Sequence, residues 1–285
     1  MESVPYVFCD EVCAVLKYLG ALVKLTSDNS NCGIWKSAVE AIGAGRVAVE
    51  VRFGYTDHVW SYGIRKIEGT KISFQDLKAI SIRRVQISSV GIGHTLRSSH
   101  ISTVEEIKEI LKYSVPLVNL ARMWISEDLK IPDDILVELL SPFCNSSFSV
   151  INVCYSKAAE HLLTVQLQSE GLKIIYIRGH GWSDELRVSI ECFALTKPFT
   201  NVDAEDSLVF GLTFLKKLFR KSCTHDWFTF TARFGVKFRK LRELKKEMQI
   251  HKTNDTIVWR RSDGVKIEIK RCNDSGLWIK FTRDY

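Results

Sequence analysis

The residues best suited to nucleophilic catalysis lie in one short segment, Gly179-His-Gly-Trp-Ser-Asp184. A serine, a histidine and a carboxylate can form a catalytic triad, in which the histidine accepts the serine proton. Triad members usually come from separate elements of the fold, whereas His180, Ser183 and Asp184 are almost adjacent in sequence. We therefore interpret this segment as a loop at a strand end, in which the glycines permit a tight turn.

Signals for a cofactor or a metal are weaker still. Gly43-Ala-Gly45 precedes a strand-like stretch rather than a helix, and Gly91-Ile-Gly93 lacks the third glycine of a dinucleotide-binding loop. Cys9 and Cys13 have no second Cys/His pair at zinc-finger spacing. Cys223-Thr-His225 falls in a predicted turn between two hydrophobic segments. We expect no metal, no cofactor and no enzymatic activity.

The composition is that of a globular protein, with 46% hydrophobic and 26% charged residues in 285. It excludes a disordered chain, a collagen-like fibre and a simple coiled coil. The net charge of +7 is unevenly distributed, because residues 214–285 carry 19 lysines and arginines against 8 acidic residues. Such an asymmetry indicates an acidic partner such as nucleic acid, anionic lipid or an acidic protein, or else a solvated face.

The basic residues of this region fall on two predicted helices. The second helix has an apolar stripe of Leu241, Leu244 and Met248. Its lysines could therefore lie on the solvent-exposed face of a packed helix or contact phosphates. No zinc finger, RNA-recognition signature or helix-turn-helix is legible, so we do not favour nucleic-acid binding. The candidate basic patch consists of Lys216, Lys217, Arg220, Lys221, Arg239, Lys240, Arg242, Lys245 and Lys246.

The sequence predicts an intracellular protein. Glu2, Asp10 and Glu11 interrupt the start of the chain, so no export signal is visible. No apolar run approaches the ~20 residues that span a bilayer. The eight cysteines are scattered, mostly within apolar segments, which is typical of buried thiols in a reducing compartment. We expect a cytoplasmic or nuclear location and no contact with membranes.

Two regions differ in their hydrophobic pattern. Residues 1–45 show helical spacing of apolar residues, which predicts a small helical unit. From Arg46-Val-Ala-Val-Glu-Val-Arg-Phe53 the pattern alternates, which predicts a strand, and a second strand follows at His58–Ile67. Gly54 and Asp57 are placed in the turn between these two strands. The predicted domains are therefore residues 1–45 and residues 46–285.

Strand-like and helix-like segments alternate from about residue 82 to residue 213, which favours parallel strands covered by helices. Three of the strands fit a degenerate leucine-rich repeat, and an ordinary parallel α/β sheet is the alternative. The predicted strands are Ile82–Ser88, Leu117–Ile125, Phe148–Tyr155, Leu172–Arg178 and Leu186–Leu195, and the predicted helices are Val104–Tyr113, Pro132–Leu140, Ala158–Gln168 and Ser207–Phe219.

The chain ends in a predicted β-meander. Thr256–Arg261 and Val265–Lys270 flank a Ser-Asp-Gly turn, and Leu277–Phe281 forms a third strand. Trp259 and Trp278 are expected to anchor one face of this meander. The fold class is therefore α/β, or α+β: a helical unit followed by a mixed, partly leucine-rich-repeat-like domain that ends in the meander.

The N-terminal unit begins with Val4-Pro5, continues with apolar residues from Phe8 to Leu22 and carries Trp35 in its second helical stretch. It resembles an F-box, in which a Leu-Pro start and an apolar helix precede a helix that carries tryptophan. The later region resembles the F-box-associated regions of nematode protein families, through Trp259-Arg-Arg-Ser-Asp-Gly264, Leu277-Trp-Ile-Lys-Phe281 and the helix at Phe214–Phe219. Val4 stands where the family has leucine. The residues that the resemblance assigns to adaptor binding are Val4, Pro5, Phe8, Val12, Val15, Leu16, Leu19, Leu22 and Trp35.

The resemblance implies a non-enzymatic adaptor of a cullin–RING (SCF-type) ubiquitin ligase. The F-box-like unit would bind a Skp-type adaptor, and the second domain would bind a protein target. Phe8, Val12, Val15 and Leu19 have the spacing of helix-in-groove anchors, although the same residues could pack on the chain's own core. The alternatives are an orphan interaction module with a decayed F-box, and a nucleic-acid-binding protein that uses the basic region.

Overall fold

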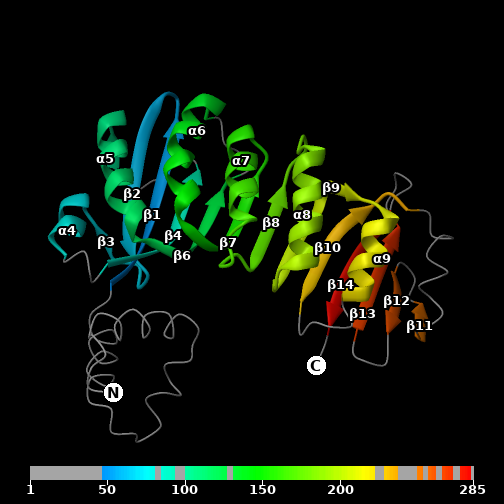
Figure 1. The fold of residues 1–285 in the computed structure, drawn as a ribbon. Helices are drawn as coiled ribbons and strands as arrows, with labels where there is room; N and C mark the ends of the chain where they lie inside the picture. Colours follow the sequence, from blue (N-terminus) through cyan, green and yellow to red (C-terminus); the bar gives the residue numbers. More distant parts are fainter. Residues whose placement is uncertain are drawn as a thin grey trace, which may run out of the picture.

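The computed structural model describes residues 47–80, 85–93, 100–126, 131–221, 228–236, 249–252, 256–260, 265–271 and 277–283. These residues form one mixed α/β domain dominated by a single sheet of 14 strands (Figure 1). The first half contains β1 (Val47–Thr56), β2 (Val59–Lys66), β3 (Lys71–Ile72), α4 (Phe74–Ala79), β4 (Val85–Gly93), β5 (His100–Ser102), α5 (Val104–Ser114), β6 (Val118–Ile125), α6 (Asp133–Leu140) and β7 (Ser147–Cys154). The second half contains α7 (Lys157–Gln166), β8 (Ile174–Arg178), α8 (Asp184–Thr196), β9 (Asn201–Phe210), α9 (Leu212–Lys221), β10 (Thr229–Phe234), β11 (Gln249–Lys252), β12 (Thr256–Arg260), β13 (Val265–Arg271) and β14 (Leu277–Arg283).

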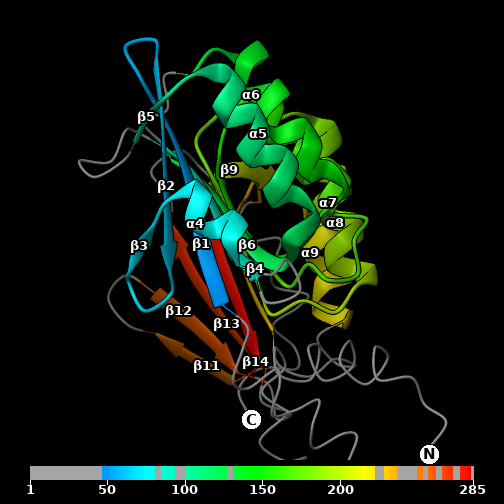
Figure 2. The same cartoon turned by 90° about the vertical axis from the view of Figure 1, so that its left-hand side faces the viewer.

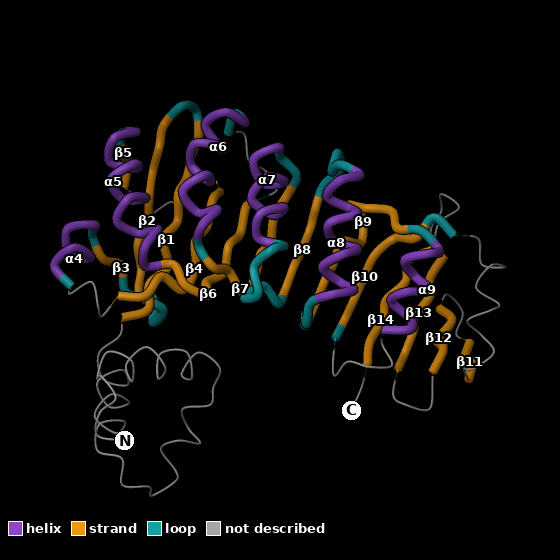
Figure 3. The backbone as a smooth tube through the Cα atoms, viewed as in Figure 1, coloured by secondary structure: helices purple, strands orange, loops and turns teal. Residues whose placement is uncertain are grey.

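The order of strands in the sheet follows the order of the chain. Strands β1, β4, β6, β7, β8, β9 and β10 are neighbours in that sequence, and each pair is parallel. Antiparallel strands extend both edges, with β2, β3 and β5 at one end and β14, β13, β12 and β11 at the other. A helix stands in every crossover between the parallel strands, as the alternation in Figure 3 shows.

This order places all the described helices on one side of the sheet. Crossovers between parallel strands are nearly always right-handed, and a strand order that never reverses sends every right-handed crossover over the same face. Figure 2 shows the result, with α4 to α9 on one side of the sheet and no described helix on the other. The side without a described helix is called the open face below. No helix in the described ranges is long and apolar enough to cross a membrane.

The core lies between the sheet and its helices. One row of buried side chains runs across the sheet in register, and each member is at most 2% exposed. The row continues from the parallel strands into the terminal meander, so the two regions share one core. Its members are Val51, Val90, Met123, Ile151, Ile175, Val202, Phe230, Phe281, Ile267 and Trp259.

Most of the predicted strands and helices are confirmed, but residues 186–195 were predicted as a strand and form helix α8. Leu186, Ile190 and Phe193 are buried at helical spacing. The backbone N–H of Leu186 donates to the hydroxyl of Ser183, which caps the helix, and two acidic residues occupy the first turn. A run rich in apolar residues fits either element, and the cap decides in favour of the helix.

The prediction for residues 207–219 is wrong in its first part. Strand β9 continues to Phe210, and the helix begins only at Leu212. Val209 pairs with Arg233 and Phe210 with Phe234 in the parallel neighbour β10. Pairing with this later strand, which local periodicity does not reveal, therefore extends β9 beyond the expected boundary.

The two hairpin predictions need smaller corrections. Gly54 lies within β1 and pairs with Ser61, and the turn is the two-residue loop Asp57-His58, in which both residues have positive φ.

In the meander, Trp259 is buried against the helices, whereas Trp278 points to the open face. Leu277 and Ile279 alternate with Trp278, so register places the two tryptophans on opposite faces.

Tyr62 links β2 to helix α5 and gives the fold a pH dependence. Its hydroxyl donates to a Glu106 carboxylate oxygen at 3.0 Å. Burial, and then this carboxylate, raise the pKa of Tyr62 to about 12. An unfolded tyrosine ionises near pH 10, so the unfolded state releases a proton between pH 10 and pH 12 while the folded state retains it. Stability is therefore lost as the pH rises through this window.

We expect Tyr62→Phe to remove this part of the alkaline destabilisation. Urea unfolding at pH 9 and at pH 11.5 would measure it. The wild type should lose more stability between the two pH values than the variant does, by on the order of 2 kcal/mol. An equal loss in both proteins would contradict the raised pKa.

Candidate binding face of the sheet

The open face carries a second row of side chains, one residue along each strand from the buried row. Tyr176 is half-buried in this row, and Asn152 is exposed at its centre. The row crosses ten strands without a break in register, and most of its members are polar or aromatic. Its members are Arg52, Gly91, Trp124, Asn152, Tyr176, Asp203, Thr231, Lys280, Glu268 and Val258.

Trp124 lies flat on the open face, across the neighbouring strand. A Cβ atom added at Gly91 would stand 2.1 Å from the indole ring, and one at Gly93 would stand 3.2 Å from it. The glycines therefore let the ring approach the backbone of β4. The guanidinium of Arg52 lies over the ring, 5.2 Å from its centroid, and pairs with Glu50 at 2.8 Å. The strands thus hold a rigid stack of arginine, tryptophan and backbone.

Two further cations lie over aromatic rings on the same face. Arg178 lies 5.9 Å from the centroid of Tyr176 and pairs with Asp203 at 2.9 Å. Lys270 lies 5.1 Å from the centroid of Trp278. Cation–π contacts of this kind hold a charge in place while leaving its outer side free to donate hydrogen bonds. The open face is therefore a surface of ordered donors.

The described side chains give the open face a positive charge. Lys266 donates a hydrogen bond to Glu268 and lowers the pKa of that carboxyl, and the charges of Lys280 and Lys270 lower it further. Three of the described carboxylates stand on the face: Glu50, Asp203 and Glu268. The ten basic residues described on it are Arg52, Arg65, Lys71, Arg122, Arg178, Arg233, Arg260, Lys266, Lys270 and Lys280.

Some donors on the face have no acceptor among the described residues. Arg52 Nε and Trp278 Nε1 are enclosed by protein atoms and make no hydrogen bond. Arg122 is exposed and forms no ion pair within the described part of the chain. The exposed guanidinium of Arg122 therefore fits a ligand that supplies acceptor oxygens.

We expect Gly91→Ala to destabilise the protein by about 1–3 kcal/mol, because the new methyl group would overlap the Trp124 indole. Gly63→Ala is the matched control. Gly63 pairs with Arg52 in strand β2, and nothing lies within 4 Å of the position of its Cβ. Urea unfolding followed by tryptophan fluorescence would compare the two. Equal stabilities would contradict the flat placement of the ring.

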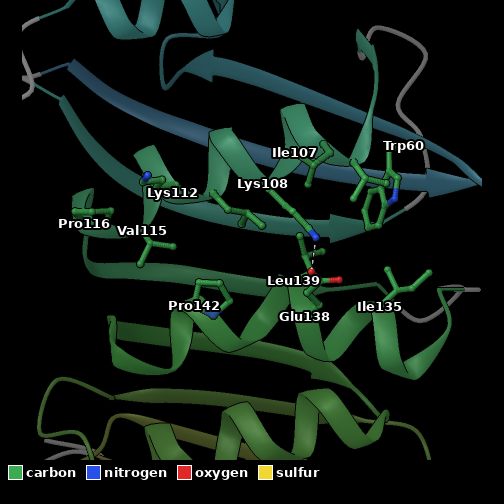
Figure 4. A pocket seen from close by; sticks show the side chains of 12 residues that line it. Trp60, Ile107, Lys108, Lys112, Val115, Pro116, Ile135, Glu138, Leu139 and Pro142 are labelled. Atoms are coloured by element: carbon green, nitrogen blue, oxygen red, sulfur yellow. Dashed lines mark ion pairs between the residues drawn. The ribbon is translucent and has the colours of Figure 1, made fainter.

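A groove lies on the opposite side of the molecule, between helices α5 and α6 (Figure 4). It encloses about 650 Å³ and is mostly apolar. Lys108 and Glu138 form an ion pair across it at 2.6 Å, and this hydrogen bond raises the pKa of Lys108. The side chains that line the groove include no serine, cysteine or histidine. Its apolar walls include Trp60, Ile107, Leu111, Val115, Ile135 and Leu139.

Residues 179–184, the candidate catalytic segment, form a tight turn and the cap of helix α8. Gly179 and Gly181 have positive φ, which confirms the predicted tight turn. The Ser183 hydroxyl caps α8 and contacts the Glu160 carboxylate, while Asp184 pairs with Arg187. No group of three potential metal ligands occurs among the described residues.

The residues predicted to bind an adaptor, Val4 to Trp35, lie outside the described residues, as do Arg239, Lys240, Arg242, Lys245 and Lys246. Lys216, Lys217, Arg220 and Lys221 belong to α9, on the helix-covered side of the sheet. The structure therefore separates these four from the basic residues of the open face. Sequence reasoning missed the open face, although Gly91 and Gly93 inside an apolar strand were a signal of a close approach.

Comparisons with protein-family models, with curated proteins and with solved structures found no match for this chain.

Proposed function

We propose that this protein is a non-enzymatic interaction module that recognises a protein target through the open face of its sheet. The observation that carries the proposal is the row of polar and aromatic side chains that crosses ten strands on the face opposite the described helices. Repeat proteins whose strands follow one another in chain order use such extended faces for binding. The partly leucine-rich-repeat-like character of the domain is part of this proposal.

The aromatic and cationic side chains of the open face favour binding of a macromolecule. Aromatic and arginine side chains contribute most of the binding energy at protein interfaces, and here Trp124, Tyr176, Trp278 and their cations are held in place before a partner arrives. Preorganised side chains lose less entropy on binding.

The cellular role that we propose is target recognition for a cullin–RING ubiquitin ligase, with residues 1–45 as the F-box-like unit that binds a Skp-type adaptor. The apolar residues at Phe8, Val12, Val15 and Leu19 support it through their helical spacing. Recognition by the open face does not depend on this role.

A pull-down with a purified Skp-type adaptor tests the ligase role. The full chain should bind saturably, and Pro5→Ala/Phe8→Ala/Leu16→Ala should lose at least about tenfold in affinity. The matched control, Asp10→Ala/Lys17→Ala, changes polar residues of the same segment and should bind as the wild type does. Circular dichroism would establish that all three proteins are folded. No binding by the folded wild type would contradict the ligase role and favour the orphan interaction module.

A further inference from the structure

The basic residues of the open face form two groups with a neutral region between them. At one end, Arg65 and Arg52 share Glu50, and Arg122 adds an unshared charge. At the centre, Arg178 is neutralised by Asp203. At the other end, Glu268 is the one acidic side chain described, and it stands among Arg233, Arg260, Lys266, Lys270 and Lys280.

The distance between the groups defines the length of a ligand. Strands β6 and β14 carry Arg122 and Lys280, and five steps from strand to strand separate them. At the usual spacing of neighbouring strands, five steps span roughly 24 Å. An extended polypeptide covers this distance with about seven residues. Between the two groups the ligand would cross Asn152, which has a side-chain amide, and its neighbour Tyr176, which has a phenol ring.

The aromatic rings distinguish between two acidic ligands. Single-stranded nucleic acid binds sheets by stacking its bases on open aromatic faces. Here Trp124 is sandwiched between Gly91 and Arg52, while Tyr176 and Trp278 have cations over their rings. A base would have to displace these cations, whereas a carboxylate can accept hydrogen bonds from them where they are.

We propose that the open face binds an extended acidic segment of a partner protein, with carboxylates at two points about seven residues apart and polar residues between them. This inference rests on the proposed recognition function, since it names the chemistry of the target. The carboxylates supply the acceptors that the described residues do not give to Arg122, Lys270 and Lys280.

The experiment uses a labelled peptide with two pairs of glutamates separated by five serine, glutamine and tyrosine residues, so that the centres of the pairs lie seven residues apart, titrated with the full chain by fluorescence anisotropy. Arg122→Gln/Lys270→Gln/Lys280→Gln should bind about tenfold or more weakly. The control, Lys112→Gln/Lys157→Gln/Lys217→Gln, removes the same charge from exposed residues of α5, α7 and α9 and should bind within about twofold of the wild type. Circular dichroism would show that both variants are folded.

A peptide of the same composition with its four glutamates together should bind more weakly than the spaced peptide. Three results would overturn the inference: no binding by the wild type, equal losses in the two triple variants, or a single-stranded oligonucleotide that binds more tightly than the peptide and loses affinity in the open-face variant. Adaptor binding without peptide binding would overturn this inference alone. Peptide binding without adaptor binding would overturn only the ligase role.

Discussion

Ile151→Asp is expected to prevent stable folding, whereas Asn152→Asp is expected to leave the fold intact. Ile151 is fully buried in the row between Met123 and Ile175, beneath the helices. An aspartate there would bury a carboxylate without a partner, which costs more than about 4 kcal/mol. Asn152 is the next residue of the same strand, but it is exposed on the open face, where the same substitution should change stability by less than about 0.5 kcal/mol.

Circular dichroism and urea unfolding of the two variants would measure this contrast. Asn152→Asp should also weaken binding of the spaced acidic peptide by about two- to threefold, because it places a like charge in the path of the ligand. Two variants of similar stability would contradict the assignment of the covered and open faces. Tighter binding of the acidic peptide by Asn152→Asp would contradict the charge argument.

Phe230→Ala is expected to lower the free energy of unfolding by about 3–5 kcal/mol. The ring is fully buried in β10, and its centroid lies 5.3 Å from that of Phe214, 5.5 Å from that of Phe210 and 6.4 Å from that of Phe199. These rings come from a helix, a strand and a loop, so removing Phe230 leaves a cavity that no single neighbour can fill. The loss should weaken the junction between the parallel strands and the terminal meander.

The matched control is Val209→Ala, because Val209 lies on the neighbouring strand β9 and is 50% exposed. It should change the free energy of unfolding by less than about 0.5 kcal/mol. Urea unfolding followed by circular dichroism would compare both variants with the wild type. A loss below about 1 kcal/mol in Phe230→Ala would show that the phenylalanine cluster is not part of the cooperative core.

Local sequence patterns predicted the elements of the sheet well. The alternating pattern predicted β1 and β2, and the helix predicted at Val104–Tyr113 is α5, which the structure shows to be capped by the side chain of Thr103. The apolar residues of 186–195 fit a strand as well as a helix, but the Ser183 cap and the two acidic residues that follow it are signals of a helix start. A cap signal is short, but it distinguishes a helix from a strand where composition does not.

The open face could not be predicted, because it follows from the order of strands rather than from any one strand. When the parallel strands lie in the sheet in the same order as in the chain, the right-handedness of their crossovers decides which face the helices cover. Only then do Arg52, Trp124, Tyr176 and Lys280, which are far apart in sequence, fall into one row. The sequence placed the basic excess of the C-terminal region on helices, whereas five basic residues of its strands reach the open face.

Photo-crosslinking with the spaced acidic peptide tests the location of the binding surface most directly. A photoreactive amino acid would replace Asn152 at the centre of the open face or, as the control, Val188, which is 55% exposed on helix α8. We predict that the peptide crosslinks from position 152, and that an excess of unlabelled peptide abolishes the product. Crosslinking from position 188 at an equal or greater yield would contradict recognition by the open face.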